Sequence, residues 1–219
     1  MHHDLDISVD AGTVAAGAAR YVAQRAREVV AERGRFTFAV SGGHTPWAMF
    51  AKLRQEDMPW AGTELFQVDE RVAPDGDPDR NLTHLRESIG DTAAQVHAMP
   101  VTAPDLAAAA EAYAAVLPQQ FDLVHLGLGP DGHTASLVPG DPVLEETDAL
   151  VGVTQPYQGH PRMTLTYPAL ARADQLLWLI TGPDKREPLA KLLAGDKSIP
   201  AGRVQAARSL IMADQAAAG

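Results

Sequence analysis

The feature of this sequence that most constrains its fold is the alternation of short apolar runs with longer helical segments. The apolar runs span residues 36–40, 65–70, 95–100, 121–126, 149–155, 162–167, 175–181 and 209–214. They mostly lack polar alternation, which is typical of strands buried on both faces. Helical spacing marks the segments between them, at residues 13–33, 82–89, 104–117 and 183–194, with one helical turn at 168–172. We therefore expect an α/β fold with an open, mostly parallel sheet covered by helices on both faces.

Composition limits what such a fold can do. The chain has 219 residues, 46% of them hydrophobic, and no change of composition or linker divides it. We expect residues 1–219 to form a single catalytic domain. The absence of cysteine excludes a disulfide framework, thiol catalysis and cysteine-ligated zinc. The net charge of −10 argues against nucleic acid and anionic membranes as partners, so a bound phosphate needs a local cationic pocket.

The sequence also carries expectations about location. No apolar run reaches the roughly 18 residues of a membrane span. The first ten residues lack the basic-then-apolar pattern of a signal peptide. We expect a cytoplasmic protein, and the sequence leaves its oligomeric state open between a monomer and a weak dimer.

Four polar loops follow predicted strands. They read SGGHTP at 41–46, DERVAP at 69–74, GLGPDGH at 127–133 and TGPDK at 181–185. Ligand sites in open α/β sheets lie at the carboxyl ends of the strands. We therefore expect these loops to meet in one pocket. We also expect Thr45 to cap the helix that follows the first loop, with Pro46 at its first position.

The third loop contains glycines with the G-x-G-x-x-G spacing of a dinucleotide-binding turn, at Gly127, Gly129 and Gly132. That interpretation requires a helix to begin at the third glycine. Pro139 and Gly140 follow too soon for a full helix. A tight turn with an aspartate cap would explain the glycines, but it gives no reason for a histidine directly after Gly132.

The same loop, GLGPDGHTASLVPG, resembles the signature of the 6-phosphogluconolactonase family. The segments AVSGGHTP, QVDERVAPDGDPDRN, HPRMTLTYPAL, LITGPDKREPL and IPAGRV are similar to the family's other motifs, in the same order, from residue 36 to residue 214. The chain departs from the family pattern at four positions, namely His44, Ala73, Arg80 and Val138. The resemblance implies the fold of the sugar-phosphate isomerases and glucosamine-6-phosphate deaminases.

The resemblance also implies an activity, the hydrolysis of 6-phospho-D-glucono-1,5-lactone to 6-phospho-D-gluconate in the oxidative pentose phosphate pathway. A lactone is an activated ester, so we expect neither a metal nor another cofactor. His133 is the expected general base, since an imidazole titrates near neutral pH. Asp131 would orient the imidazole or brace the loop. Backbone N–H groups of Gly42, Gly43 or Gly132 are candidate donors to the developing oxyanion.

The remaining expected site residues bind the substrate, a small phosphosugar lactone. Arg71, Arg162 and Lys185 are the candidate phosphate ligands. The family pattern places cations at all three positions, although surface ion pairs or solvation would also explain them. Asp69 and Asn81 would bond sugar hydroxyls, and the loop with Ser41 and Thr45 would serve the phosphate or the hydroxyls.

Two other functions stay open. A glucosamine-6-phosphate deaminase or isomerase would share the same loops, but it should carry a glutamate where Val138 stands. A non-catalytic sugar-phosphate sensor is the second alternative, although no helix-turn-helix segment accompanies the domain. We expect His44, His125 and His160 to be structural, and His125 to be a hydrogen-bonded core residue.

Overall fold

The computed structural model describes residues 2–219 and contains a large sheet of seven strands. Their spatial order is β1-β10-β9-β6-β2-β3-β5, and every neighbouring pair is parallel. The strands are β1 (Asp4–Ser8), β2 (Phe36–Val40), β3 (Thr63–Gln67), β5 (Gln95–His97), β6 (Leu123–Leu126), β9 (Gln175–Ile180) and β10 (Arg208–Asp214). The expectation of an open parallel sheet is confirmed.

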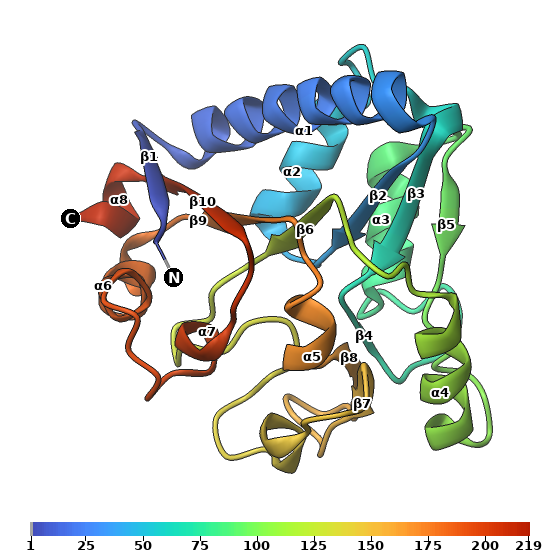
Figure 1. Cartoon of the computed structure of the whole chain (residues 1–219). Helices are drawn as coiled ribbons and strands as arrows, with labels where there is room; N and C mark the ends of the chain where they lie inside the picture. The colour runs from blue at the N-terminus through green and yellow to red at the C-terminus, as the bar shows by residue number, and fades with distance from the viewer. Residues whose placement is uncertain (1) are drawn as a thin grey trace.

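Helices cover both faces of this sheet, as expected (Figure 1). One face packs against α1 (Ala11–Arg33), α2 (His44–Leu53) and α3 (Asn81–Ile89). The opposite face packs against α4 (Leu106–Val116), α5 (Tyr167–Leu170), α6 (Arg186–Leu193), α7 (Pro200–Arg203) and α8 (Gln215–Ala218). Strand β9 shows how one sequence serves both layers: Leu177 and Leu179 enter the first core, whereas Trp178 and Ile180 enter the second. Continuous apolar runs are the consequence of burial on two faces.

A second sheet lies beside the first and is antiparallel. It consists of β4 (Asp69–Arg71), β8 (Arg162–Leu165) and β7 (Val151–Val153), with β8 in the middle. The prediction of one strand over residues 65–70 is therefore wrong. Val68 divides it, because its N–H donates to the Val40 carbonyl of the large sheet (2.9 Å) and its own carbonyl accepts from Leu165 N–H of the small sheet (2.8 Å).

Three further details differ from the expectations. Strand β1, which forms an edge of the large sheet beside β10, is missing from the predicted strands, because those were identified as continuous apolar runs and β1 is a mostly exposed edge strand with only two apolar residues. The predicted helix over residues 183–194 is a 3₁₀ turn, Pro183–Lys185, followed by α6. Thr45 does not cap α2: the helix already begins at His44, and the Thr45 hydroxyl bonds the Thr181 hydroxyl (2.7 Å).

Two other 3₁₀ turns, Trp60–Gly62 and Pro142–Glu145, complete the regular structure. Within residues 2–219, no helix combines the length and the apolar character that crossing a membrane requires.

Candidate active site

A cavity of about 440 Å³ opens at the carboxyl ends of four adjacent strands, β9, β6, β2 and β3. The four polar loops meet there, as expected from the topology. Ten of the predicted site residues line the cavity: Ser41, Gly42, Gly43, Thr45, Asp69, Arg71, Asn81, His133, Arg162 and Lys185. Asp131 and Gly132 lie outside the lining. His44, Thr181 and Asp184 line it although they were not among the predicted site residues.

His133 stands at the wall of this cavity with one ring nitrogen already engaged. Its Nδ1 lies 2.5 Å from Asp131 Oδ1, and the same oxygen accepts its backbone N–H at 3.1 Å. A carboxylate acceptor at Nδ1 selects the tautomer whose Nε2 has a free lone pair. Partial burial alone would raise the pKa of Asp131, but the His133 backbone N–H, the imidazole charge and the ring hydrogen bond outweigh burial and lower it. Asp131 thus both orients the ring and braces the loop.

Two glycines of the signature loop make room for this arrangement. A Cβ at Gly129 would lie 2.1 Å from His133 Nδ1, so the imidazole packs directly on the glycine backbone. Gly132 has a φ of +82°, and a Cβ there would lie 2.5 Å from Ile199. The Gly132 N–H donates to the Gly129 carbonyl (3.0 Å). Of the three candidate donors to an oxyanion, the Gly132 N–H is thus already used by the turn in this structure.

Arg71 and Arg162 are directly opposite each other on the paired strands β4 and β8. Like charges in such a pair repel unless an anion lies between or beside them. Neither guanidinium has a carboxylate within ion-pair distance among residues 2–219; Arg71 Nη1 donates to Asn81 Oδ1 (2.6 Å), and Arg162 Nη2 reaches only the Tyr157 carbonyl and Gln158 Oε1, at 3.4 Å each. Burial, and secondarily the neighbouring Arg71, lower the pKa of Arg162.

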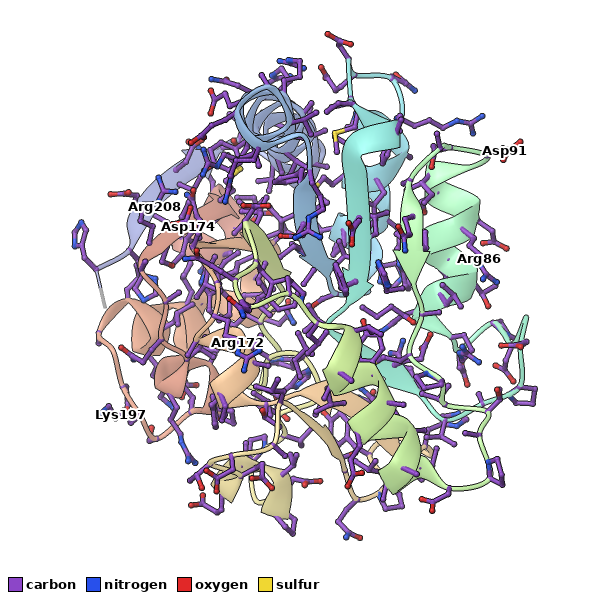
Figure 2. All side chains as sticks on the ribbon, turned by 45° about the vertical axis from the view of Figure 1, so that its right-hand side comes forward. Arg86, Asp91, Arg172, Asp174, Lys197 and Arg208 are labelled. Carbon is purple, nitrogen blue, oxygen red and sulfur yellow. The ribbon has the colours of Figure 1, made fainter. Side chains whose placement is uncertain are left out.

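Several arginines outside the cavity do pair with carboxylates. Figure 2 shows Arg208 beside Asp174, at the opposite, amino-terminal edge of the sheet. Asp174 also accepts from Arg25 (3.1 Å). Arg71 and Arg162 have no such carboxylate partner among residues 2–219, and two adjacent guanidinium groups in a cavity have the chemistry that suits an anion.

Asp69 is a buried carboxyl group in the same cavity. Its Oδ2 accepts from the Ser136 hydroxyl (2.7 Å), and Asn81 Nδ2 donates to its carbonyl (3.0 Å). Burial raises the pKa of Asp69, although Ser136 and the two arginines act in the opposite direction. Asn81 in turn packs on Gly42, where a Cβ would lie 2.0 Å from Asn81 Oδ1.

Glu70 has a structural role that could not be predicted from the sequence. It is fully buried and does not pair with Arg71; instead its Oε2 lies 3.0 Å from Nε of buried Arg80, without hydrogen-bond alignment. Its two oxygens also accept the backbone N–H groups of Asn81 (2.7 Å) and Leu82 (2.9 Å). The carboxylate thereby caps α3 and holds Asn81 at the cavity.

The loops that follow β2 and β9 complete the cavity. The N–H groups of Gly42 and Gly43 make no hydrogen bond to any residue of 2–219. They precede the amino terminus of α2, where backbone donors favour anions. Behind them, Ser41 N–H donates to Nδ1 of buried His125 (3.3 Å), and burial lowers the pKa of His125 to about 3. His125 is hydrogen-bonded and buried, as expected.

Lys185 is placed in the cavity but carries a partner of its own. Its Nζ lies 2.7 Å from the Asp184 carboxylate, and both side chains belong to the lining. The loop that carries Lys185 is fixed to the end of β10, because Gly182 N–H donates to the carboxylate of buried Asp214 (3.1 Å). No group of three or more His, Cys, Asp or Glu side chains in residues 2–219 is arranged to hold a metal ion.

The fold and the site together define an α/β protein with a cationic cleft and a histidine–aspartate pair at the carboxyl edge of a parallel sheet. The family model described as glucosamine-6-phosphate isomerases/6-phosphogluconolactonase matches residues 9–212, and the chain belongs to this family.

Individual relatives agree with that assignment. The chain is 34% identical to a 6-phosphogluconolactonase of Synechocystis, over 87% of this chain and 86% of that one. It is 33% identical to a 6-phosphogluconolactonase of Streptomyces coelicolor, over 100% and 92% of the two chains. The crystal structure of 6-phosphogluconolactonase from Thermotoga maritima superposes with a TM-score of 0.87 at 27% identity, covering 97% of this chain and all of that one. A monomeric glucosamine-6-phosphate deaminase shares the fold, with a TM-score of 0.85 at 18% identity.

Proposed function

We propose that this chain is an enzyme that hydrolyses 6-phospho-D-glucono-1,5-lactone to 6-phospho-D-gluconate, the lactonase step of the oxidative pentose phosphate pathway. The observation that carries the proposal is that one cavity holds an aspartate-oriented histidine and two opposed arginines that have no carboxylate partner among residues 2–219. The first pair suits activation of water, and the second suits a phosphate dianion. The names of the relatives support the same substrate.

In this proposal His133 Nε2 takes a proton from water as its oxygen attacks the lactone carbonyl. Asp131 accepts the Nδ1–H bond and stabilises the imidazolium that forms. The N–H groups of Gly42 and Gly43 are the candidate donors to the carbonyl oxygen as it becomes anionic. The ester C–O bond then breaks, and the imidazolium returns its proton to the departing ring oxygen. The reaction needs no covalent intermediate.

The phosphate is assigned to Arg71, Arg162 and Lys185. Asp69 and Asn81 are assigned to sugar hydroxyls, because both present polar atoms to the cavity. Lys185 would exchange its ion pair with Asp184 for the phosphate. The whole chain acts as one catalytic unit in this proposal, since its site residues come from loops spread between Ser41 and Lys185.

The deaminase alternative receives less support. Val138, at the position where a deaminase carries glutamate, is buried and does not line the cavity. No other observation favours ring opening of an amino sugar.

The deciding experiment is an assay of the purified protein with freshly generated 6-phosphogluconolactone, with spontaneous hydrolysis subtracted. The proposal expects saturable, enzyme-dependent hydrolysis that 6-phosphogluconate inhibits competitively. Binding of 6-phosphogluconate without any hydrolysis would support the sensor alternative instead.

A further inference from the structure

Tyr157 contacts both the proposed base pair, His133 and Asp131, and a proposed phosphate ligand, Arg162. Its hydroxyl donates to Asp131 Oδ2 (3.3 Å), while Asp131 Oδ1 is occupied by His133. Its ring meets the His133 ring edge-on, with centroids 5.6 Å apart. The guanidinium of Arg162 lies over the same ring, with Cζ 5.0 Å from the centroid. Neither the family motifs in the sequence nor the cavity lining includes this residue.

The backbone around Tyr157 holds it in place. It lies at the tip of the hairpin between β7 and β8, where Tyr157 N–H donates to the His160 carbonyl (2.9 Å) and His160 N–H to the Tyr157 carbonyl (3.4 Å). Gln158 (φ 52°) and Gly159 (φ 92°) form the tip, as in a type I′ turn. His160 Nε2 ties the turn to Asp79 (3.1 Å). The tip is thus a braced hairpin end.

We infer that Tyr157 is a positioning residue for both halves of the site: its hydroxyl fixes Asp131 and thereby the His133 ring, and its ring supports the Arg162 guanidinium. The inference rests on the proposed function, because it assigns roles relative to the base and the phosphate. A single aromatic residue can do both, since its face attracts a cation and its hydroxyl donates to a carboxylate.

The electrostatic consequence has a definite sign. The Tyr157 hydroxyl donates a hydrogen bond to the Asp131 carboxylate and so partly neutralises its negative charge. Without this hydrogen bond, the carboxylate stabilises the His133 imidazolium more strongly. In the Tyr157→Phe variant, the imidazolium of His133 should therefore lose its proton only at a higher pH than in the wild type. The substitution leaves in place the other ionisable groups that line the cavity with His133: His44, Asp69, Arg71, Arg162, Asp184 and Lys185.

Two variants separate the two contacts. Tyr157→Phe keeps the ring under Arg162 and removes only the hydroxyl. We expect the acid limb of its kcat/KM profile to move upward by about 0.5 pH unit, with the Kd for 6-phosphogluconate within about twofold of wild type. Tyr157→Leu removes the ring as well, and we expect the Kd to rise about threefold to tenfold, the range for a partly desolvated cation–π contact. Tyr21→Phe, on α1 away from the cavity, is the matched control and should change neither quantity.

Kd measurement by calorimetry and NMR titration of the His133 ring make the outcome independent of turnover. If the wild type fails to hydrolyse the lactone, the proposed function fails, and the ring titration of Tyr157→Phe still decides the hydroxyl's role. If the wild type is active but Tyr157→Phe has an unmoved titration midpoint and an unmoved acid limb, the inference is overturned. If the Tyr157→Leu variant folds and binds 6-phosphogluconate with the wild-type Kd, the inference that the Tyr157 ring supports Arg162 is overturned. If circular dichroism shows that Tyr157→Leu does not fold, Tyr157→Trp replaces it, because tryptophan keeps an aromatic face without the hydroxyl. We expect this variant to keep the wild-type Kd and to move the acid limb of the kcat/KM profile upward.

Discussion

At the scale of single residues, we expect a substitution of His133 to affect proton transfer but not substrate binding. The His133→Asn change keeps a polar group in a loop that Gly129 and Gly132 already shape. It removes the group that takes a proton near neutral pH. We expect kcat to fall at least about 100-fold, the usual worth of a general base, with little change in 6-phosphogluconate affinity. The acid limb of kcat/KM, which reports protonation of the general base, should disappear. A variant with near-full activity and the same pH profile would exclude His133 as the base.

The opposed arginines make a second prediction at this scale. Arg71→Ala or Arg162→Ala should weaken binding of 6-phosphogluconate by about 1.5–3 kcal/mol, the range for hydrogen bonds to charged groups. The fold should tolerate the loss, because each change also removes the repulsion between the two strands. Calorimetry measures the affinity, with Arg172→Ala as the control, since Arg172 is not among the residues that line the cavity. Unchanged affinity in both variants would remove the pair from the phosphate site.

At the scale of elements, the carboxyl ends of β2 and β6 are joined by the hydrogen bond from Ser41 N–H to His125. Burial holds His125 neutral in the native protein down to about pH 3. The unfolded chain protonates this ring below about pH 6.5, so it binds one more proton than the native state in that window. His125 therefore lowers stability as the pH falls, by up to about 1.4 kcal/mol per pH unit.

Urea unfolding of the wild type, His125→Leu and His125→Asn at pH 4 to 7 tests this. Both variants should show a shallower loss of stability toward acid than the wild type. His125→Asn keeps an acceptor for Ser41 N–H, so it should retain the wild-type KM better than His125→Leu does. Parallel stability curves in all three proteins would contradict a buried neutral histidine.

At the scale of the whole molecule, the fold alone does not separate lactonase from deaminase, because proteins of both kinds share it. The resemblance to the family implies that a deaminase carries a glutamate at the position of Val138, and valine provides no carboxylate to open an amino-sugar ring. We expect the purified protein to hydrolyse 6-phosphogluconolactone and to release no ammonia from glucosamine 6-phosphate. Enzyme-dependent ammonia release, measured in parallel with the lactone assay, would reverse the ranking of the two functions.

The sequence by itself determined the features that depend on local order. Continuous apolar runs can only be satisfied by burial on two faces, so the parallel sheet and its helical layers followed from the pattern. Parallel strands have their carboxyl ends at one edge, so the meeting of the four loops followed as well. The polar residues in those loops therefore marked most of the cavity, including His133 and Arg71.

Only the tertiary structure decided what depends on partners distant in the chain. The apolar run over residues 65–70 does not reveal that Val68 bonds two different sheets, because its partners Val40 and Leu165 are remote in sequence. The pairing of Glu70 with Arg80, and the loss of Gly132 N–H to the turn, depend in the same way on three-dimensional geometry. Tyr157 belongs to no sequence motif, and only the folded hairpin brings it into contact with Asp131 and Arg162. Hydrogen bonds and ion pairs act over a few ångströms in space, whereas a sequence pattern records only spacing along the chain.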